Sequence, residues 1–256
     1  LASLGHGSGI SSETLLTNLR TSRGSVLNNR GTGSGGEESE SELLDSDVAY
    51  FSQTGTPNNG GVGLSLANCT FENPCGPTDF SQTGVNTLNS LLPNTLMFFN
   101  GGTYNALDAT GSNPITLNSG QGVNARTADY SQAATGSGRS VFNGAFILNT
   151  NNTLANIILL PTAATASGTG VTDNNGTNDF IRGSQIGNIN NLYNVGVVIS
   201  TNQLTITNSV IFGNNRGIRA DNGSVLFIQG SQINTVSPSG GTTGISASNS
   251  NIILND

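Results

Sequence analysis

The sequence of 256 residues contains no lysine and no tryptophan, and it has one histidine, one methionine and two cysteines. Without lysine, the chain cannot form a Schiff base with a substrate carbonyl or a P-loop for phosphate. The only histidine, His6, is far in sequence from the rest of the polar residues considered below. A Ser-His-Asp triad is therefore not expected in the main part of the chain.

Charge is also scarce. Charged residues make up 9% of the sequence and the net charge is -7, whereas ordinary globular domains carry roughly 25% charged residues. Binding to nucleic acid requires a basic stripe, so the chain is not expected to bind nucleic acid. No apolar run approaches the roughly 20 residues of a membrane span, so none is predicted.

Glycine is abundant, with 35 residues. Together with many Asn, Ser and Thr residues, it favours short strands joined by tight turns. The stretch GIRADNGSVLFIQGSQI, Gly217 to Ile233, has imperfect copies that begin at Gly170, Gly196 and Gly244, at intervals of 26, 21 and 27 residues. Repeats of this length are typical of solenoids, in which each repeat is one coil.

Each repeat also has an apolar residue ten positions after its glycine. These residues are Phe180, Ile206, Phe227 and Leu254. We expect them to stack as inward-facing side chains. Apolar residues over Val197–Ile199, Leu204–Ile206 and Val210–Phe212 predict three strands in a coil. This arrangement is typical of a parallel β-helix, in which the strands of stacked coils lie about 4.8 Å apart. The turns between strands contain Asn and Asp, which tolerate left-handed backbone: Asn151, Asn152, Asn202, Asp221, Asn222 and Asn249.

The part before the repeats has the pattern of a cap. Val48–Phe51 and Leu96–Phe99 are predicted strands. Between them, Val85, Leu88, Leu91 and Leu92 share one helical face, which predicts a helix over Thr78–Leu92 that ends at Pro93. A helix laid across the first coil would shield its open edge and apolar end.

Residues 1–47 have a different composition. They begin with several glycines and end with six acidic residues between Glu37 and Asp47. This acidic run is either a calcium or partner site or a solvated linker, and we favour the linker. We therefore predict a flexible, acidic segment over 1–47 and one domain over 48–256. The pattern stops within a repeat at Asp256, so we expect the domain to be truncated at its C-terminal end.

The two cysteines lie in CTFENPC as Cys69 and Cys75. We predict a disulfide between them, which fits an oxidising compartment. Free thiols and a metal site are the alternatives. A zinc site would require four ligands at characteristic spacings, and His6 is distant in sequence. The sequence predicts no metal site and no cofactor, and it leaves calcium binding open.

The order FENPCGP, LLPNT, LMFFNGGTYNA and ITLNSGQGVNAR resembles the N-terminal cap and first coils of right-handed parallel β-helix passengers of autotransporter-like bacterial surface proteins, including inverse autotransporters. The resemblance covers roughly residues 48–256. It implies a secreted, surface-displayed protein, anchored to the outer membrane by analogy, that binds a host surface protein, a glycan or another copy of itself. The residues that carry it are Phe71, Asn73, Pro74, Gly76, Pro77, Leu91, Leu92, Pro93, Gly102, Thr103, Tyr104, Ile115, Leu117, Gly120, Gln121 and Gly122.

Five charged residues of the repeats are the candidates for a binding site. Asp173 and Asp221 lie three and four places after a repeat glycine, so neighbouring coils could bring them onto one face. Arg182, Arg216 and Arg219 could join them there. The predicted function is non-enzymatic adhesion or binding. One alternative is a pectate-lyase-like enzyme that acts on polysaccharides, which needs paired carboxylates, or calcium with a basic residue. Another is a structural filament or stalk.

Overall fold

The computed structural model describes residues 48–56, 69–80, 91, 93–107, 113–163, 165–174, 176–236 and 243–255. All of them belong to one unit of the chain, Asp47–Asp256. The segment predicted over residues 1–47 lies outside the described residues.

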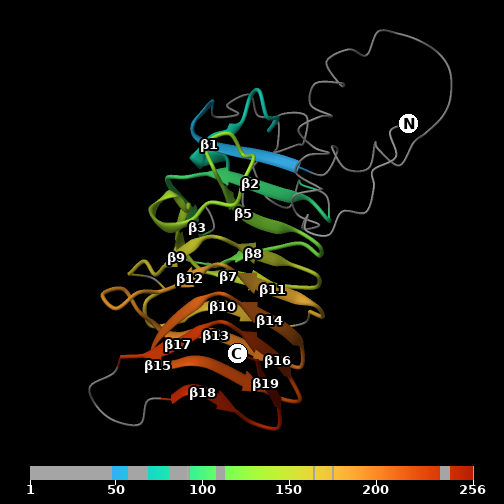
Figure 1. The fold of residues 1–256 in the computed structure, drawn as a ribbon, viewed down its shortest axis with the longest axis vertical. Helices are drawn as coiled ribbons and strands as arrows, with labels where there is room; N and C mark the ends of the chain where they lie inside the picture. Colours follow the sequence, from blue (N-terminus) through green and yellow to red (C-terminus); the bar gives the residue numbers. More distant parts are fainter. Residues whose placement is uncertain are drawn as a thin grey trace, which may run out of the picture. The chain divides into compact units, whose positions relative to one another are not determined.

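The described part of the chain forms an all-β fold with parallel sheets, as predicted (Figure 1). One sheet has eight strands in the order β1-β2-β5-β8-β11-β14-β16-β19. The strands predicted at Val48–Phe51 and Leu96–Phe99 are confirmed as β1 and β2. The eight strands are β1 (Val48–Thr56), β2 (Leu96–Asn100), β5 (Gly122–Arg126), β8 (Thr153–Ala155), β11 (Asp179–Arg182), β14 (Gln203–Thr207), β16 (Val225–Gln229) and β19 (Asn251–Asn255).

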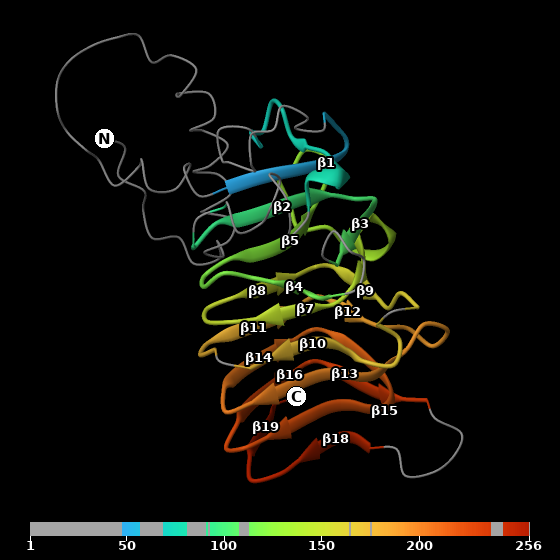
Figure 2. The same ribbon diagram turned by 180° about the vertical axis from the view of Figure 1, so that it is seen from behind.

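The second sheet consists of two ladders that meet at the long strand β15 (Val210–Asp221). The strands β3, β6, β9 and β12 form one ladder, and β4, β7, β10 and β13 form the other (Figure 2). Both β17 and β18 also pair with β15. The bounds are β3 (Thr103–Ala106), β4 (Ile115–Thr116), β6 (Val141–Gly144), β7 (Phe146–Leu148), β9 (Ile158–Leu160), β10 (Thr169–Asp173), β12 (Gln185–Ile186), β13 (Tyr193–Ser200), β17 (Gln232–Thr235) and β18 (Thr243–Ala247).

The repeat glycines lie in register on adjacent strands. The flanking pairs Thr169 with Val195 and Val171 with Val197 align Gly170 with Gly196, and Gly217 and Gly244 follow in the same column. A Cβ atom added at Gly196 would lie 2.7 Å from the carbonyl oxygen of Gly217. The equivalence of these four glycines, which the sequence predicts, is therefore confirmed, and the absence of a Cβ atom allows the backbones to approach closely.

Apolar side chains fill the space between the sheets. One inward column on the eight-stranded sheet consists of Val123, Leu154, Ile181, Ile206 and Ile228, all buried and paired in register. Towards β1 the interior is aromatic. Six buried rings contact one another there, with centroids between 4.6 and 6.4 Å apart: Phe51, Phe80, Phe99, Tyr104, Phe142 and Phe146.

The predicted capping helix falls mostly outside the described residues, because 81–90 and 92 are not described. At its expected start the chain forms a 3-10 helix, Pro77–Asp79, and the buried Phe80 follows it. A second 3-10 helix, Gly136–Gly138, lies between β5 and β6. The described ranges contain no α-helix.

The prediction that Phe180, Ile206, Phe227 and Leu254 stack as one column is wrong. Ile206 is in register with the buried Ile181 and Ile228, and Leu254 continues this register on β19, where it is 64% exposed. Phe180 is instead in register with Thr205 and Phe227. Because successive side chains of a strand point to opposite faces, the two phenylalanines lie on the outer face of the sheet.

Candidate binding face on the eight-stranded sheet

The outer face of the eight-stranded sheet carries a column of large apolar side chains. Phe180, Thr205, Phe227 and Ile253 are in register on β11, β14, β16 and β19. Phe180 is 41% exposed and Ile253 is 39% exposed, and Phe227 is half-buried. Since neighbouring strands lie about 4.8 Å apart, the two phenylalanines are separated by about 10 Å along the stack of strands.

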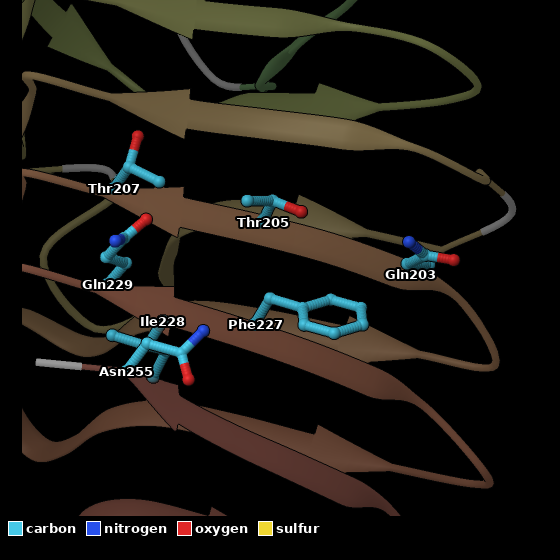
Figure 3. Close-up of a pocket in the computed structure, with 7 residues that line it drawn as sticks. All are labelled: Gln203, Thr205, Thr207, Phe227, Ile228, Gln229 and Asn255. Atoms are coloured by element: carbon cyan, nitrogen blue, oxygen red, sulfur yellow. The ribbon is translucent and has the colours of Figure 1, made fainter.

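Phe227 lies in a shallow groove of about 340 Å³ on this face (Figure 3). In the figure its ring lies between Gln203 on one side and Gln229 on the other. None of the lining side chains is titratable, and most of them are amides or hydroxyls that can both donate and accept hydrogen bonds. The groove is lined by Gln203, Thr205, Thr207, Phe227, Ile228, Gln229 and Asn255.

Near β1 the same outer face is covered by the chain itself. Tyr50 on β1 contacts Phe71 and Tyr130, with ring centroids 5.7 and 5.0 Å apart. The Arg126 guanidinium lies 4.5 Å from the ring centroid of Phe98. The Tyr130 hydroxyl donates a hydrogen bond to the Phe51 carbonyl at 2.9 Å. Local loops therefore bury Phe98 and Tyr130 at this end of the sheet, although Phe71 on the covering loop is itself 52% exposed. In the described part of the chain, no such loop covers the column that contains Phe180.

The loop that carries Phe71 is closed by the Cys69–Cys75 disulfide. Both cysteines are buried, and they lie six residues apart in sequence. The predicted disulfide is confirmed, and free thiols and a metal site at these cysteines are thereby ruled out.

Of the predicted site residues, Arg182 lies beside the groove. It is exposed on β11, two residues after Phe180, and it is in register with Thr207 of the groove lining. It gives this face a positive charge next to otherwise neutral side chains.

Arg216, Arg219 and Asp221 lie together on β15, in the other sheet. The Arg219 Nε atom forms an ion pair with Asp221 Oδ2 at 2.8 Å. Arg216 is partly buried and in register with Val195 and Thr243. These three residues are thus separated from the sheet that carries Arg182.

The prediction that Asp173 and Asp221 share a face is wrong. Asp173 is in register with Ile199, whereas Asp221 is in register with Ser200. The offset of one residue places the two carboxylates on opposite faces of the sheet. Asp173 is completely buried, and Asp221 is on the partly exposed side.

Asp173 lies against a second buried carboxyl, that of Asp179, across the turn between β10 and β11. Both residues have an exposed fraction of 0%. Burial raises the pKa of Asp173, although the Asn202 amide, the Gly176 backbone N–H and Asp179 act in the opposite direction. Burial also raises the pKa of Asp179, and the adjacent Asp173 raises it further. Neither side chain can reach a ligand on the surface.

The described residues contain no group of three or more His, Cys, Asp and Glu side chains arranged to hold a metal ion. In the part of the chain that the structure describes, no helix is long and apolar enough to cross a membrane.

The repeat pattern does not reveal the outer column or the groove. Phe180 and Phe227 follow this pattern, which predicts inward positions for them. The only signal in the sequence was the alternation in strands such as QLTIT and VLFIQ, in which Thr205 and Phe227 occupy the positions between inward residues.

No family model, no curated protein and no solved structure matches this chain. What the protein binds must therefore be inferred from its own residues.

Proposed function

We propose that this chain is a secreted, right-handed parallel β-helix displayed on a bacterial surface, and that it binds a glycan on the outer face of its eight-stranded sheet without catalysing a reaction. The in-register glycines and the three recurring parallel ladders support the β-helix. The right-handed sense follows the strong preference of parallel crossover connections. The disulfide supports an oxidising, extracellular location. The resemblance to autotransporter-like passengers supports surface display.

The observation that carries the binding role is the exposed column of Phe180, Phe227 and Ile253. Exposed apolar side chains that gather on one face mark interaction sites, whereas single ones are ordinary. Here Thr205 lies between Phe180 and Phe227, Ile253 is next to Phe227, and the amides of Gln203 and Gln229 flank the groove. A sugar ring has apolar C–H faces and a rim of hydroxyls, so it matches an aromatic ring bordered by groups that donate and accept hydrogen bonds.

The geometry gives less support to the alternative of a polysaccharide-active enzyme. Cleavage of a glycosidic bond by acid–base chemistry uses two carboxyl groups that reach the substrate. Asp173 is buried and Asp221 is paired with Arg219. The groove itself is lined by neutral side chains, which suit binding better than proton transfer.

The test is a screen of the purified chain against an array of neutral and acidic glycans, followed by calorimetry with the strongest ligand. Phe227→Ala should weaken that binding at least about tenfold, which corresponds to about 1.4 kcal/mol. The matched control is Ile189→Ala, because Ile189 is 63% exposed in a turn away from the groove. It should leave the affinity unchanged.

Two outcomes would overturn the proposal. One is glycan binding that is equally strong in the wild type and in Phe227→Ala. The other is a complete absence of glycan binding. In the absence of glycan binding, sedimentation of the wild type and of Phe227→Ala would separate the alternatives. Concentration-dependent assembly of the wild type that is lost in Phe227→Ala would assign the same face to self-association. Assembly that persists in Phe227→Ala would favour the filament or stalk.

A further inference from the structure

Two aspartates lie inside the stack of strands, at the turn that joins β10 to β11. Asp173 ends β10 and Asp179 begins β11. Both are completely buried, although aspartate is almost never fully buried unless it has a partner. The turn between them includes Gly176, where an added Cβ would lie 2.1 Å from Asp179 Oδ2 and even closer to the Asn149 carbonyl oxygen. The corner is therefore tightly packed.

The surrounding strands offer no opposite charge. The residues in register with Asp173 are Leu148 on β7 and Ile199 on β13. Those beside Asp179 are Leu204 on β14 and Asn152, which immediately precedes β8.

The other titratable groups on these strands face elsewhere. On β13, the buried Tyr193 donates its hydroxyl proton to the Gly144 carbonyl at 2.6 Å, and burial raises its pKa. On β11, Arg182 is exposed on the outer face. No cation among the described residues is therefore available to compensate two buried negative charges.

One oxygen of each carboxyl group is accounted for. The Asn202 side-chain amide donates to Asp173 Oδ1, and the Gly176 backbone N–H also acts on this carboxyl group. The Asn152 backbone N–H donates to Asp179 Oδ1 at 2.6 Å. Asn152 is itself held by hydrogen bonds to the Asn118 and Gln121 carbonyls. The remaining atoms, Asp173 Oδ2 and Asp179 Oδ2, have no donor among the described residues.

Two ionised carboxylates in this position would be unfavourable for two reasons. A buried charge without a partner loses its hydration, and adjacent like charges repel in a low dielectric. A single proton between the two unpartnered oxygens removes one charge and supplies the missing donor. Both side chains belong to this one corner, at the end of β10 and the start of β11, and Asp173 raises the pKa of Asp179.

We propose that Asp173 and Asp179 share one proton at neutral pH and thereby form an acid-dependent lock on the turn between β10 and β11. Loss of this proton leaves two facing carboxylates in the interior, which destabilises the turn. Since Phe180 directly follows Asp179 and points outward, the lock lies beneath the proposed binding face. The inference concerns folding and does not depend on the proposed function.

The sign of the pH dependence follows from the direction of the shifts. Near the ordinary aspartate pKa of about 4, the unfolded chain releases these protons as pH rises. The folded pair retains at least one proton in this range, because the pKa values of Asp173 and Asp179 are raised. In that interval the folded state binds more protons, so stability falls as pH rises. Once the folded pair also loses its proton, the decline ends.

The experiment is denaturant unfolding of the full chain between pH 6 and pH 8, the range in which the raised pKa values leave the folded pair one proton. The unfolding equilibrium constant of the wild type should increase about tenfold per pH unit while the shared proton is retained, as expected for one proton. In Asp179→Asn, whose amide can donate to Asp173, this dependence should be lost. Few other groups titrate in the range, because the chain has one histidine, His6.

The control variant is Asp129→Asn. Asp129 is exposed, and hydrogen bonds from Thr127 and Ser131 lower its pKa to about 2. This variant should keep the wild-type dependence between pH 6 and pH 8. Infrared spectra at pH 7 provide a second readout. The wild type should show the carbonyl stretch of a protonated carboxylic acid, and Asp179→Asn should lack it.

Three results would overturn the proposal. The first is a wild type with no such infrared band and a flat stability between pH 6 and pH 8. The second is an Asp179→Asn variant that folds and keeps the full dependence. The third is a wild type that a chelator destabilises at pH 7, because a cation rather than a proton would then lie between the carboxylates.

Discussion

Phe180 is paired with Thr205, although both the repeat spacing and the apolar character of the residues favour Ile206 as its partner. The cause is the length of the corner that follows the repeat glycine. Nine positions separate Gly170 from the inward residue Asp179, and eight separate Gly196 from Leu204, with which Asp179 is in register. One extra residue moves a side chain to the other face of the strand.

The register makes a direct prediction about Ile206. It is completely buried between Ile181 and Ile228, so Ile206→Asp would place an unpaired charge in an apolar column. We expect a loss of more than about 4 kcal/mol of unfolding free energy in denaturant unfolding. Thr205→Asp is the matched control, because Thr205 directly precedes Ile206 and faces outward. This substitution should change the unfolding free energy by less than about 1 kcal/mol. Equal effects of the two substitutions would contradict the register.

Much of the fold could be predicted from particular residues. The glycines at 170, 196, 217 and 244 mark equivalent points of the repeats because the backbones approach closely there, and this requirement is visible in sequence. The outward orientation of the Phe180 and Phe227 side chains could not be predicted in the same way. It depends on whether a corner has eight or nine positions, and flexible Asn- and Gly-containing turns accommodate both lengths.

The candidate site was less predictable than the fold. The position of Asp173 after its repeat glycine predicts a shared charged face that Arg182 could join. In the structure Asp173 faces inward, and Arg182 lies beside the groove. The sequence of the turn does not show that two aspartates are buried together without a cation. Their surroundings depend on the register of the neighbouring strands, which places Leu148 and Ile199 beside Asp173.

A second prediction concerns the glycine column. A Cβ atom at Gly196 would lie 2.6 Å from Ile211 Cγ2 and 2.7 Å from the Gly217 carbonyl oxygen. Gly196→Ala should therefore reduce the unfolding free energy by about 1–3 kcal/mol, because the strands must move apart. At Gly244 the nearest atom is the Ile233 carbonyl oxygen at 3.7 Å, so Gly244→Ala should change stability by less than about 0.5 kcal/mol. Thermal unfolding of both variants would measure the difference, and a greater loss in Gly244→Ala would contradict it.

A third prediction concerns the disulfide. Replacing both Cys69 and Cys75 by alanine releases the loop that holds Phe71 against Tyr50 and Tyr130. Closing a loop this short contributes about 2 kcal/mol in the chain-entropy account, so the melting temperature should fall. Adding reductant to the wild type should have a similar effect, and adding it to the double alanine variant should have none. Alkylation of the unfolded wild type before reduction should add no mass, and a labelled product would show that the disulfide is absent.

The fourth prediction follows from the spacing of the aromatic rings in the proposed glycan site. Phe180 and Phe227 are two strands apart, or about 10 Å along the stack, so one extended oligosaccharide could contact both, whereas a single sugar could contact only one. Affinity should therefore increase with the length of the oligosaccharide until both rings are covered and then level off. Phe180→Ala should lower the affinity for the long ligand about tenfold and leave the affinity of a monosaccharide bound at Phe227 unchanged. Phe227→Ala should weaken both. Calorimetry with an oligosaccharide series would measure these values, and an equal loss of monosaccharide affinity in the two variants would show that the rings do not act as separate contacts along one chain.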